Sequence, residues 1–265
     1  MEFKFALLRS GRTRYSLSGP ERAPVVMFCN SLMADMRMWD WVATSLAEDW
    51  RLLRYDMRGH GGTDAPPGDY TVTELAEDAA QLLEHLQLSG VHLVGISLGG
   101  MVAMQLAALH PARFVSLTIG STGTRLALEV RSAWDARAKA AREGGLATIA
   151  DATLSRWFTQ EFPQREPGVV DEVRNMLLSV QPQGYAGCAA AIRDLAIDDV
   201  PVQLSLRTLF LHGRHDGAWP ESGARELATR LRAPLRLIEG AGHIPCIEQP
   251  RAYADALLEF LEAGP

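Results

Sequence analysis

The chain has 265 residues, of which 47% are hydrophobic and 22% are charged, and its formal net charge is −6. That length suits one large domain, or a domain with a modest insertion, and allows a substantial buried core. The acidic balance gives no electrostatic reason to expect a nucleic acid as partner. The three cysteines, Cys29, Cys188 and Cys246, form no C-x-x-C pair, so neither a disulfide framework nor a zinc site is predicted.

The amino-terminal segment MEFKFALLRSGRTRYSLSG mixes charged residues with short apolar runs, unlike a secretory signal peptide. No segment approaches the roughly 20 apolar residues that a membrane-spanning helix needs. We therefore expect a cytoplasmic protein with no membrane partner.

Hydrophobic patterns predict alternating strands and helices. Strands are expected at 3–8, 14–17, 24–29, 52–55, 91–96, 114–119, 208–211 and 235–238, the first two as a hairpin. Helices are expected around 39–46 and at 71–88, 99–110, 222–231 and 251–262. Thr71 and Glu74 form a capping box at the start of the second helix. Such alternation is typical of a parallel sheet covered by helices.

The alternation is interrupted between residues 124 and 200, where the patterns are helical and Gly144, Gly145, Pro163 and Pro182 mark breaks. We therefore predict a core formed by residues 1–123 and 201–265 and a helical cap formed by residues 124–200. An insertion at the carboxyl edge of the sheet covers the crevice where such sheets bind ligands.

The motif most informative about chemistry is Gly95-Ile96-Ser97-Leu98-Gly99. It follows a predicted buried strand and precedes a predicted helix, which is the setting of the nucleophile in the α/β-hydrolase fold. A serine in this sharp turn holds its hydroxyl clear of the sheet, and the helix amino terminus favours a developing negative charge. The sequence therefore predicts an α/β-hydrolase fold with Ser97 as nucleophile.

A serine nucleophile needs a base and an acid that orients the base, and in this fold they follow in the chain order serine, acid, histidine. Of the seven histidines, only His243 lies in a loop after the last predicted strand. Asp216 follows the strand at 208–211, whereas Asp194 lies in the helical insertion before that strand. We therefore predict Asp216 and His243 as the acid and the base, and His60 as a structural or pocket-wall residue.

The oxyanion hole is expected to combine the backbone N–H of Leu98 with that of Leu32, in the loop after the first buried strand. No H-E-x-x-H, P-loop or dinucleotide-binding glycine motif is present. The sequence therefore predicts no cofactor and no metal, and a small-molecule ester or lactone as substrate.

Several segments resemble the 3-oxoadipate enol-lactonases, a family of α/β-hydrolases that open a five-membered enol-lactone to 3-oxoadipate in the β-ketoadipate pathway of aromatic catabolism. The likeness lies in residues 30–39, 53–61, 66–71 and 95–100, and continues at 155–159 and 184–194. Asn30-Ser31 stands where most α/β-hydrolases have His-Gly. The resemblance implies the same fold, Ser97, Asp216 and His243 as triad, and Leu32 and Leu98 as oxyanion donors.

Two positions depart from the family pattern. Met33 stands where the family usually has a glycine, so we expect its side chain to reshape the substrate pocket. His243 is followed by Ile244-Pro245-Cys246, where the family tends to have a serine and an asparagine. A carboxylesterase, another lactonase, a C–C bond hydrolase and a cofactor-free perhydrolase share this triad and stay open as alternatives. A non-catalytic ligand receptor on the same fold is an alternative from a different class.

The predicted cap supplies candidates for substrate contacts. Trp134 and Trp157 are expected to form an apolar roof over Ser97, although aromatic residues at such spacing also pack cap helices together. The enol-lactone carries a carboxylate, so its pocket needs a cationic or amide-rich anchor. Arg131, Arg137 and Arg193 lie in the cap, and Arg193 is our predicted substrate-binding residue among them.

Overall fold

The computed structural model describes residues 2–263, apart from the side chains of residues 202 and 203. It contains an eight-stranded sheet in the order β1-β2-β4-β3-β5-β6-β7-β8. The strands are β1 (Lys4–Leu8), β2 (Gly11–Ser18), β3 (Val25–Cys29), β4 (Arg51–Tyr55), β5 (Val91–Ile96), β6 (Phe114–Gly120), β7 (Arg207–Gly213) and β8 (Leu235–Ile238). β2 is antiparallel to β1 and to β4, and the remaining neighbours are parallel. The predicted hairpin and mostly parallel sheet are confirmed.

Helices cover this sheet. They are α1 (Asp40–Leu46), α2 (Val72–His85), α3 (Leu98–Leu109), α9 (Val200–Gln203), α10 (Glu221–Arg230), α11 (Pro245–Glu248) and α12 (Pro250–Glu262), with 3-10 turns η1 (Met36–Trp39) and η2 (Pro111–Arg113). α3 packs on β3, β5, β6 and α2, and α12 packs on α1, β7 and β8. Every residue of β5 is buried, as expected for a parallel strand covered on both faces.

The predicted capping box at the start of α2 is confirmed. The Thr71 hydroxyl accepts from the Glu74 N–H at 3.1 Å, and the Glu74 carboxylate accepts from the Thr71 N–H at 2.8 Å. The helix ends at His85, three residues before the predicted end. Gln87 has a φ of 55°, which no α-helix accommodates, so the chain turns out of the helix there.

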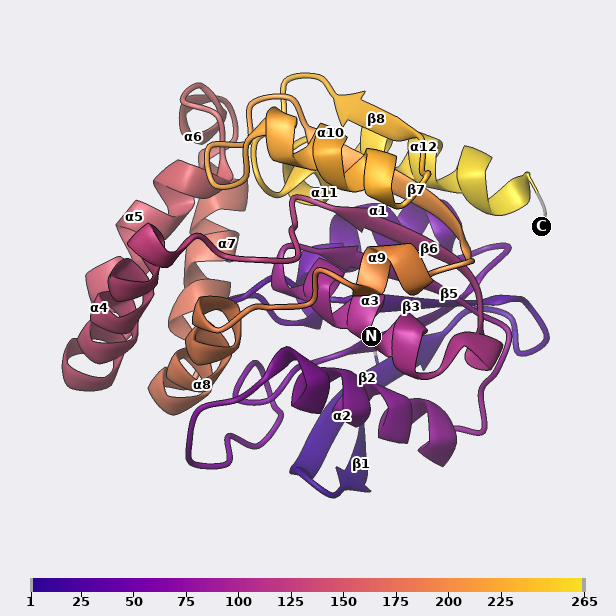
Figure 1. Cartoon of the computed structure of the whole chain (residues 1–265), viewed down its shortest axis with the longest axis horizontal. Coiled ribbons are helices and arrows are strands. Elements are labelled where there is room, and N and C mark those ends of the chain that lie inside the picture. Colours follow the sequence, from indigo (N-terminus) through magenta and orange to yellow (C-terminus); the bar gives the residue numbers. More distant parts are fainter. Residues whose placement is uncertain (1, 264–265) are drawn as a thin grey trace.

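Five helices lie together at the left of Figure 1, beside the sheet. They are α4 (Leu128–Gly144), α5 (Ala147–Trp157), α6 (Phe162–Arg165), α7 (Pro167–Leu178) and α8 (Pro182–Arg193). α4 packs on α8 and α5, and α7 packs on α5 and α6. The breaks fall at predicted residues, since α4 ends at Gly144, the next residue Gly145 has a φ of 75°, and α8 begins at Pro182.

Backbone hydrogen bonds join α8 to the loop after β4. The Gln181 N–H donates to the Gly59 carbonyl at 3.0 Å, and the Tyr70 N–H donates to the Gly187 carbonyl at 3.1 Å. A side chain on Gly59 would meet the backbone of Gly184 at 2.1 Å. The two backbones are therefore in contact, and α8 is joined by backbone hydrogen bonds to the loop after β4.

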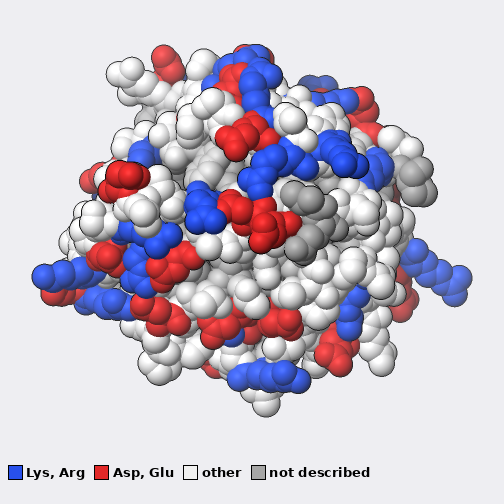
Figure 2. All heavy atoms as spheres, viewed as in Figure 1, with Lys and Arg blue, Asp and Glu red and all other residues white. Residues whose placement is uncertain are grey.

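Acidic and basic side chains are mixed over the face shown in Figure 2, in keeping with 32 acidic and 26 basic residues in the chain. Because the two signs are mixed, the face shown in Figure 2 offers no broad field of one sign for a polyanionic partner.

Among the residues that the structure describes, no helix combines the length and apolar character needed to span a membrane.

The parallel strands bring three predicted residues to one edge of the sheet. Ser97 directly follows β5, Asp216 lies three residues after β7, and His243 lies five residues after β8. Because parallel strands share a carboxyl edge, residues that are far apart in sequence meet there.

Candidate active site

Ser97 occupies a strained turn between β5 and α3. Its φ is 57°, a left-handed conformation that costs a non-glycine residue on the order of 1–3 kcal/mol. A side chain on Gly95 would meet the Gly99 carbonyl oxygen at 2.3 Å, and one on Gly99 would meet the Cys29 carbonyl oxygen at 2.0 Å. The two glycines of the motif are therefore required by close backbone packing, which places Ser97 at the apex of the turn.

Asp216 and His243 form a buried hydrogen-bonded pair. The Nδ1 atom of His243 lies 2.9 Å from both carboxylate oxygens of Asp216. The N–H groups of Ala218 and Trp219 donate to Asp216 Oδ1 at 2.8 and 2.9 Å. Burial alone raises the pKa of Asp216, but His243 and the Trp219 N–H outweigh it and hold the pKa below its usual value. An ionised Asp216 thus keeps the proton of His243 on Nδ1 and leaves Nε2 free to act as a base.

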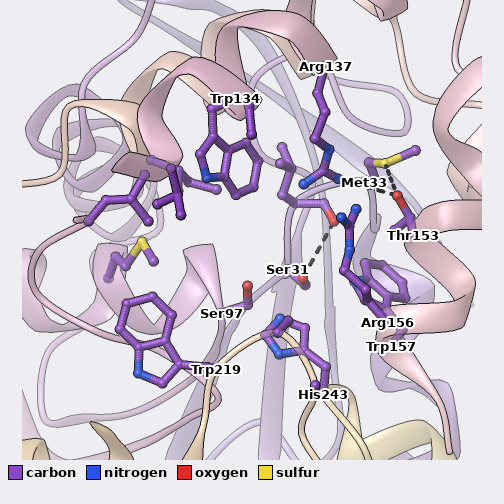
Figure 3. Close-up of a pocket in the computed structure, with 18 residues that line it drawn as sticks. Ser31, Met33, Ser97, Trp134, Arg137, Thr153, Arg156, Trp157, Trp219 and His243 are labelled. Atoms are coloured by element: carbon purple, nitrogen blue, oxygen red, sulfur yellow. Dashed lines mark hydrogen bonds between the residues drawn. The ribbon is translucent and has the colours of Figure 1, made fainter. Parts of the chain in front are cut away.

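Ser97 and His243 lie side by side at the floor of one pocket (Figure 3), which has a volume of about 310 Å³. That volume suits a small molecule. The lining residues come from the loops after β3, β6, β7 and β8, from the turn after β5 and the α3 helix that follows it, and from α4, α5 and α8. They are Ser31, Leu32, Met33, Ser97, Met101, Leu126, Val130, Ala133, Trp134, Arg137, Thr153, Arg156, Trp157, Ile192, Gly217, Ala218, Trp219 and His243.

Two backbone N–H groups near Ser97 are available for an oxyanion. Leu98 is the first residue of α3, where the N–H has no partner within the helix. Leu32 lines the pocket in the loop after β3. Within residues 2–263, neither N–H donates a hydrogen bond. The predicted pair of oxyanion donors therefore fits this geometry.

The apolar wall of the pocket includes three residues predicted to contact the substrate. Trp134, Trp157 and Met33 all line it, and Met33 and Trp157 are buried. Trp219 also lines it and was missed by the sequence interpretation. The available signal was its position three residues after Asp216, in the same loop.

The arginines that line the pocket do not include Arg193, the arginine predicted to bind the substrate. Arg193 is not among the lining residues, because its guanidinium is paired at the surface with Asp69, Asp135 and Asp194. Two other arginines, Arg137 and Arg156, line the pocket instead (Figure 3).

Arg137 lies over the ring of Trp134 at 4.5 Å and donates to the Thr153 hydroxyl at 3.3 Å. Burial lowers the pKa of Arg137 below its usual value, although a guanidinium stays charged in proteins. No carboxylate in the described part of the chain forms an ion pair with Arg137 or Arg156. The pocket therefore carries uncompensated positive charge opposite Ser97.

The three cysteines are not among the residues that line the pocket. Cys29, Cys188 and Cys246 are free and buried, and burial raises the pKa of the Cys29 thiol to about 12. Over residues 2–263, no cluster of three histidine, cysteine or acidic side chains is placed to hold a metal ion. Catalysis by a cysteine thiolate is therefore disfavoured at these positions.

The chain belongs to the α/β-hydrolase fold family, whose sequence pattern it matches over residues 24–250. Within that class it belongs with the 3-oxoadipate enol-lactonases. It is 31% identical to 3-oxoadipate enol-lactonase 2 of Acinetobacter baylyi, over 92% of this chain and 90% of that protein. It is 29% identical to 3-oxoadipate enol-lactonase 1 of the same species, over 96% and 95%. The crystal structure of the enol-lactonase from Burkholderia xenovorans LB400 superposes with a TM-score of 0.92, at 33% identity over 98% of this chain and all of that one.

A solved esterase is also similar. The thermophilic esterase from Thermogutta terrifontis superposes with a TM-score of 0.92 at 27% identity, over 99% of each chain. The family and the likeness to these hydrolases support hydrolytic activity on a small ester or lactone.

Proposed function

We propose that this protein is a serine hydrolase that opens 3-oxoadipate enol-lactone to 3-oxoadipate. The observation that carries the mechanism is the buried Asp216–His243 pair, with His243 Nδ1 2.9 Å from both carboxylate oxygens and Ser97 beside it in one pocket. The family supports the choice of a lactone. The helices of residues 124–200 act as a cap over the site in this proposal.

The reaction proceeds in two steps. Ser97 Oγ attacks the lactone carbonyl carbon while its proton passes to His243 Nε2, and the oxyanion accepts from the N–H groups of Leu32 and Leu98. Collapse of the intermediate breaks the ring C–O bond, and His243 returns the proton to the leaving enol oxygen. The enol then becomes the ketone, still attached to the acyl group. Water, activated by His243, hydrolyses the acyl-enzyme and restores Ser97.

The two arginines support an anionic substrate. Arg137 and Arg156 are half-buried and form no ion pair among the described residues, so a carboxylate bound between them gains charge-assisted hydrogen bonds that water screens only in part. The enol-lactone carries one carboxylate besides the ring carbonyl. In this arrangement the substrate carboxylate binds the two arginines and the ring carbonyl lies at Ser97.

A hydrolysis panel tests the substrate. It compares 3-oxoadipate enol-lactone with neutral γ-lactones, acyl-homoserine lactones and short p-nitrophenyl esters. We expect the highest kcat/KM for the enol-lactone. A preference for the neutral compounds would remove the enol-lactone as substrate and leave ester hydrolysis standing.

Two serine variants test the mechanism. Ser97→Ala is expected to lower turnover on the order of 10³-fold or more, as in other triads. Ser121→Ala serves as the matched control with a much smaller loss, because Ser121 also directly follows a strand with a positive φ of 51° but is not among the residues that line the pocket. Hydrolysis by Ser97→Ala at the wild-type rate contradicts the serine mechanism. Stoichiometric acylation of the wild type without turnover points instead to a ligand receptor.

A further inference from the structure

The loop that carries Leu32 contains a strained turn. The Ala34 N–H donates to the Ser31 carbonyl at 3.1 Å, and Met33, the third residue of this turn, has a φ of 67°. Leu32 has no such positive φ, so the turn is of type II, which normally has glycine at its third position. A side chain there costs roughly 1–2 kcal/mol. Turning over the peptide between Leu32 and Met33 would give a type I turn and relieve that strain.

His60 opposes this peptide flip. The Met33 N–H donates to His60 Nε2 at 3.1 Å, and His60 Nδ1 lies 2.8 Å from the Arg58 carbonyl oxygen. Since a carbonyl only accepts, Nδ1 carries the ring proton and Nε2 is the acceptor. Burial lowers the pKa of His60, which keeps the ring neutral and this acceptor available. His60 is fully buried and is not among the residues that line the pocket.

The histidine is itself held by its own loop. The His60 N–H donates to the Met57 carbonyl, and the Thr63 N–H donates to the His60 carbonyl, both at 3.0 Å. A second contact joins the same two loops, because the Met36 N–H donates to the Asp56 carboxylate at 2.9 Å. The loop after β4 therefore forms a fixed support under the loop after β3.

On the opposite side of the Leu32–Met33 peptide, the Leu32 carbonyl accepts from the Ser31 hydroxyl at 3.4 Å (Figure 3). A flip would exchange this carbonyl for the Met33 N–H and change the dihedral angles of Leu32, whose own N–H is the proposed oxyanion donor. The orientation of one peptide thus decides the polar groups presented beside Ser97.

We propose that His60 is a positioning residue that holds the Leu32–Met33 peptide in its strained orientation and so keeps the oxyanion hole formed. The contact is needed because Met33 stands at a glycine-type position. This inference rests on the serine-hydrolase mechanism proposed above. His60 acts through Met33 and Leu32, without touching the substrate.

The test is a double-mutant cycle on p-nitrophenyl acetate with His60→Asn, Met33→Gly and the double variant. Asparagine places an amide where Nδ1 lies, so it preserves the contact to the Arg58 carbonyl but is too short to reach the Met33 N–H. We expect His60→Asn to lower kcat about tenfold, the value of one backbone hydrogen bond, and to change KM less than twofold. With glycine in place of Met33, the turn is unstrained, and His60→Asn is expected to lower kcat less than threefold.

Equal losses of kcat in the two backgrounds would overturn the proposal, as would an unchanged kcat in His60→Asn. His92→Asn is the matched control, because His92 is also buried and its Nδ1 lies 2.7 Å from the Ser116 hydroxyl, away from the pocket. Its kcat is expected to stay at the wild-type value. If His60→Asn does not fold, the double variant replaces it, and a kcat tenfold below that of Met33→Gly contradicts the proposal.

Ser97→Ala is measured in the same assay to separate a failure of the serine mechanism from a failure of the positioning role of His60. Retained activity in Ser97→Ala means that the serine mechanism itself fails. An inactive Ser97→Ala together with additive His60 and Met33 effects means that only the positioning role fails.

Discussion

The backbone N–H of His243 donates a hydrogen bond of 2.8 Å to the carbonyl oxygen of Trp157, the last residue of α5. The buried carboxylate of Glu248 reinforces this junction by accepting from the N–H groups of Gly242 at 2.8 Å and Thr159 at 3.0 Å. The loop that carries the proposed base is therefore fastened to the same helix that lines the substrate pocket. Residues of the predicted cap thus help to place His243.

The first prediction concerns this junction. A side chain on Gly242 would lie 2.6 Å from the Trp157 carbonyl oxygen, so Gly242→Ala forces the His243 loop away from α5. We expect kcat to fall on the order of 10²-fold, since displacements near 1 Å at a catalytic group have effects of that size. Gly168→Ala is the control, because a side chain there meets nothing within 4 Å. Steady-state kinetics giving equal kcat values for the two variants would show that the junction does not position His243.

The second prediction concerns the acid. In Asp216→Asn the amide oxygen can still accept from the N–H groups of Ala218 and Trp219, which leaves the amide nitrogen facing His243. His243 then accepts at Nδ1 and carries its proton on Nε2, where it cannot act as a base. We expect a loss of kcat of about 10³-fold or more with an unchanged circular dichroism spectrum. Asp194→Asn, at the surface beside Arg193, is expected to keep wild-type kcat, and the reverse outcome would reassign the acid.

The third prediction concerns the carboxylate anchor. Arg137→Gln removes a charged donor from the pocket, and hydrogen bonds to charged groups contribute about 1.5–3 kcal/mol. We expect KM for the enol-lactone to rise by about tenfold or more, while kcat/KM for a neutral p-nitrophenyl ester changes little. Arg193→Gln provides the control, because that guanidinium is already paired with surface carboxylates. Equal KM values for the two variants with the enol-lactone would move the anchor away from Arg137.

The fourth prediction concerns stability in acid. Burial lowers the pKa of His92 to about 4, whereas the unfolded chain protonates it near 6.5. Between these values the unfolded state binds more protons, so stability conferred at neutral pH is lost as the pH falls from 6.5 to 4. We expect the free energy of unfolding, measured by urea titration at pH 7 and pH 4.5, to fall by about 2 kcal/mol more in the wild type than in His92→Asn. Parallel losses in the two proteins would show that His92 titrates normally in the folded state.

The amino-acid sequence by itself determined the strand–helix order and the catalytic candidates. The turn at Ser97 could be predicted from Gly95 and Gly99 because it is a local structure, and its close backbone packing admits no other residue type at the two glycines. Asp216 and His243 could be predicted because the segments that follow parallel strands lie at one edge of the sheet. The structure places Asp216, His243 and Ser97 together as predicted, while their catalytic roles stay predictions.

Only the tertiary structure decided which side chains of the helical insertion face the pocket. Ile192 and Arg193 are neighbours at the end of α8, yet Ile192 lines the pocket and Arg193 pairs with surface carboxylates. One residue along a helix turns the side chain by about 100°, so a rotation of the packed helix by about that angle would exchange the two roles. Arg137 lies three residues after Trp134 on α4 and so shares its face toward the pocket. Helix rotation is set by packing between α4, α5 and α8, and the sequence of any one helix does not specify it.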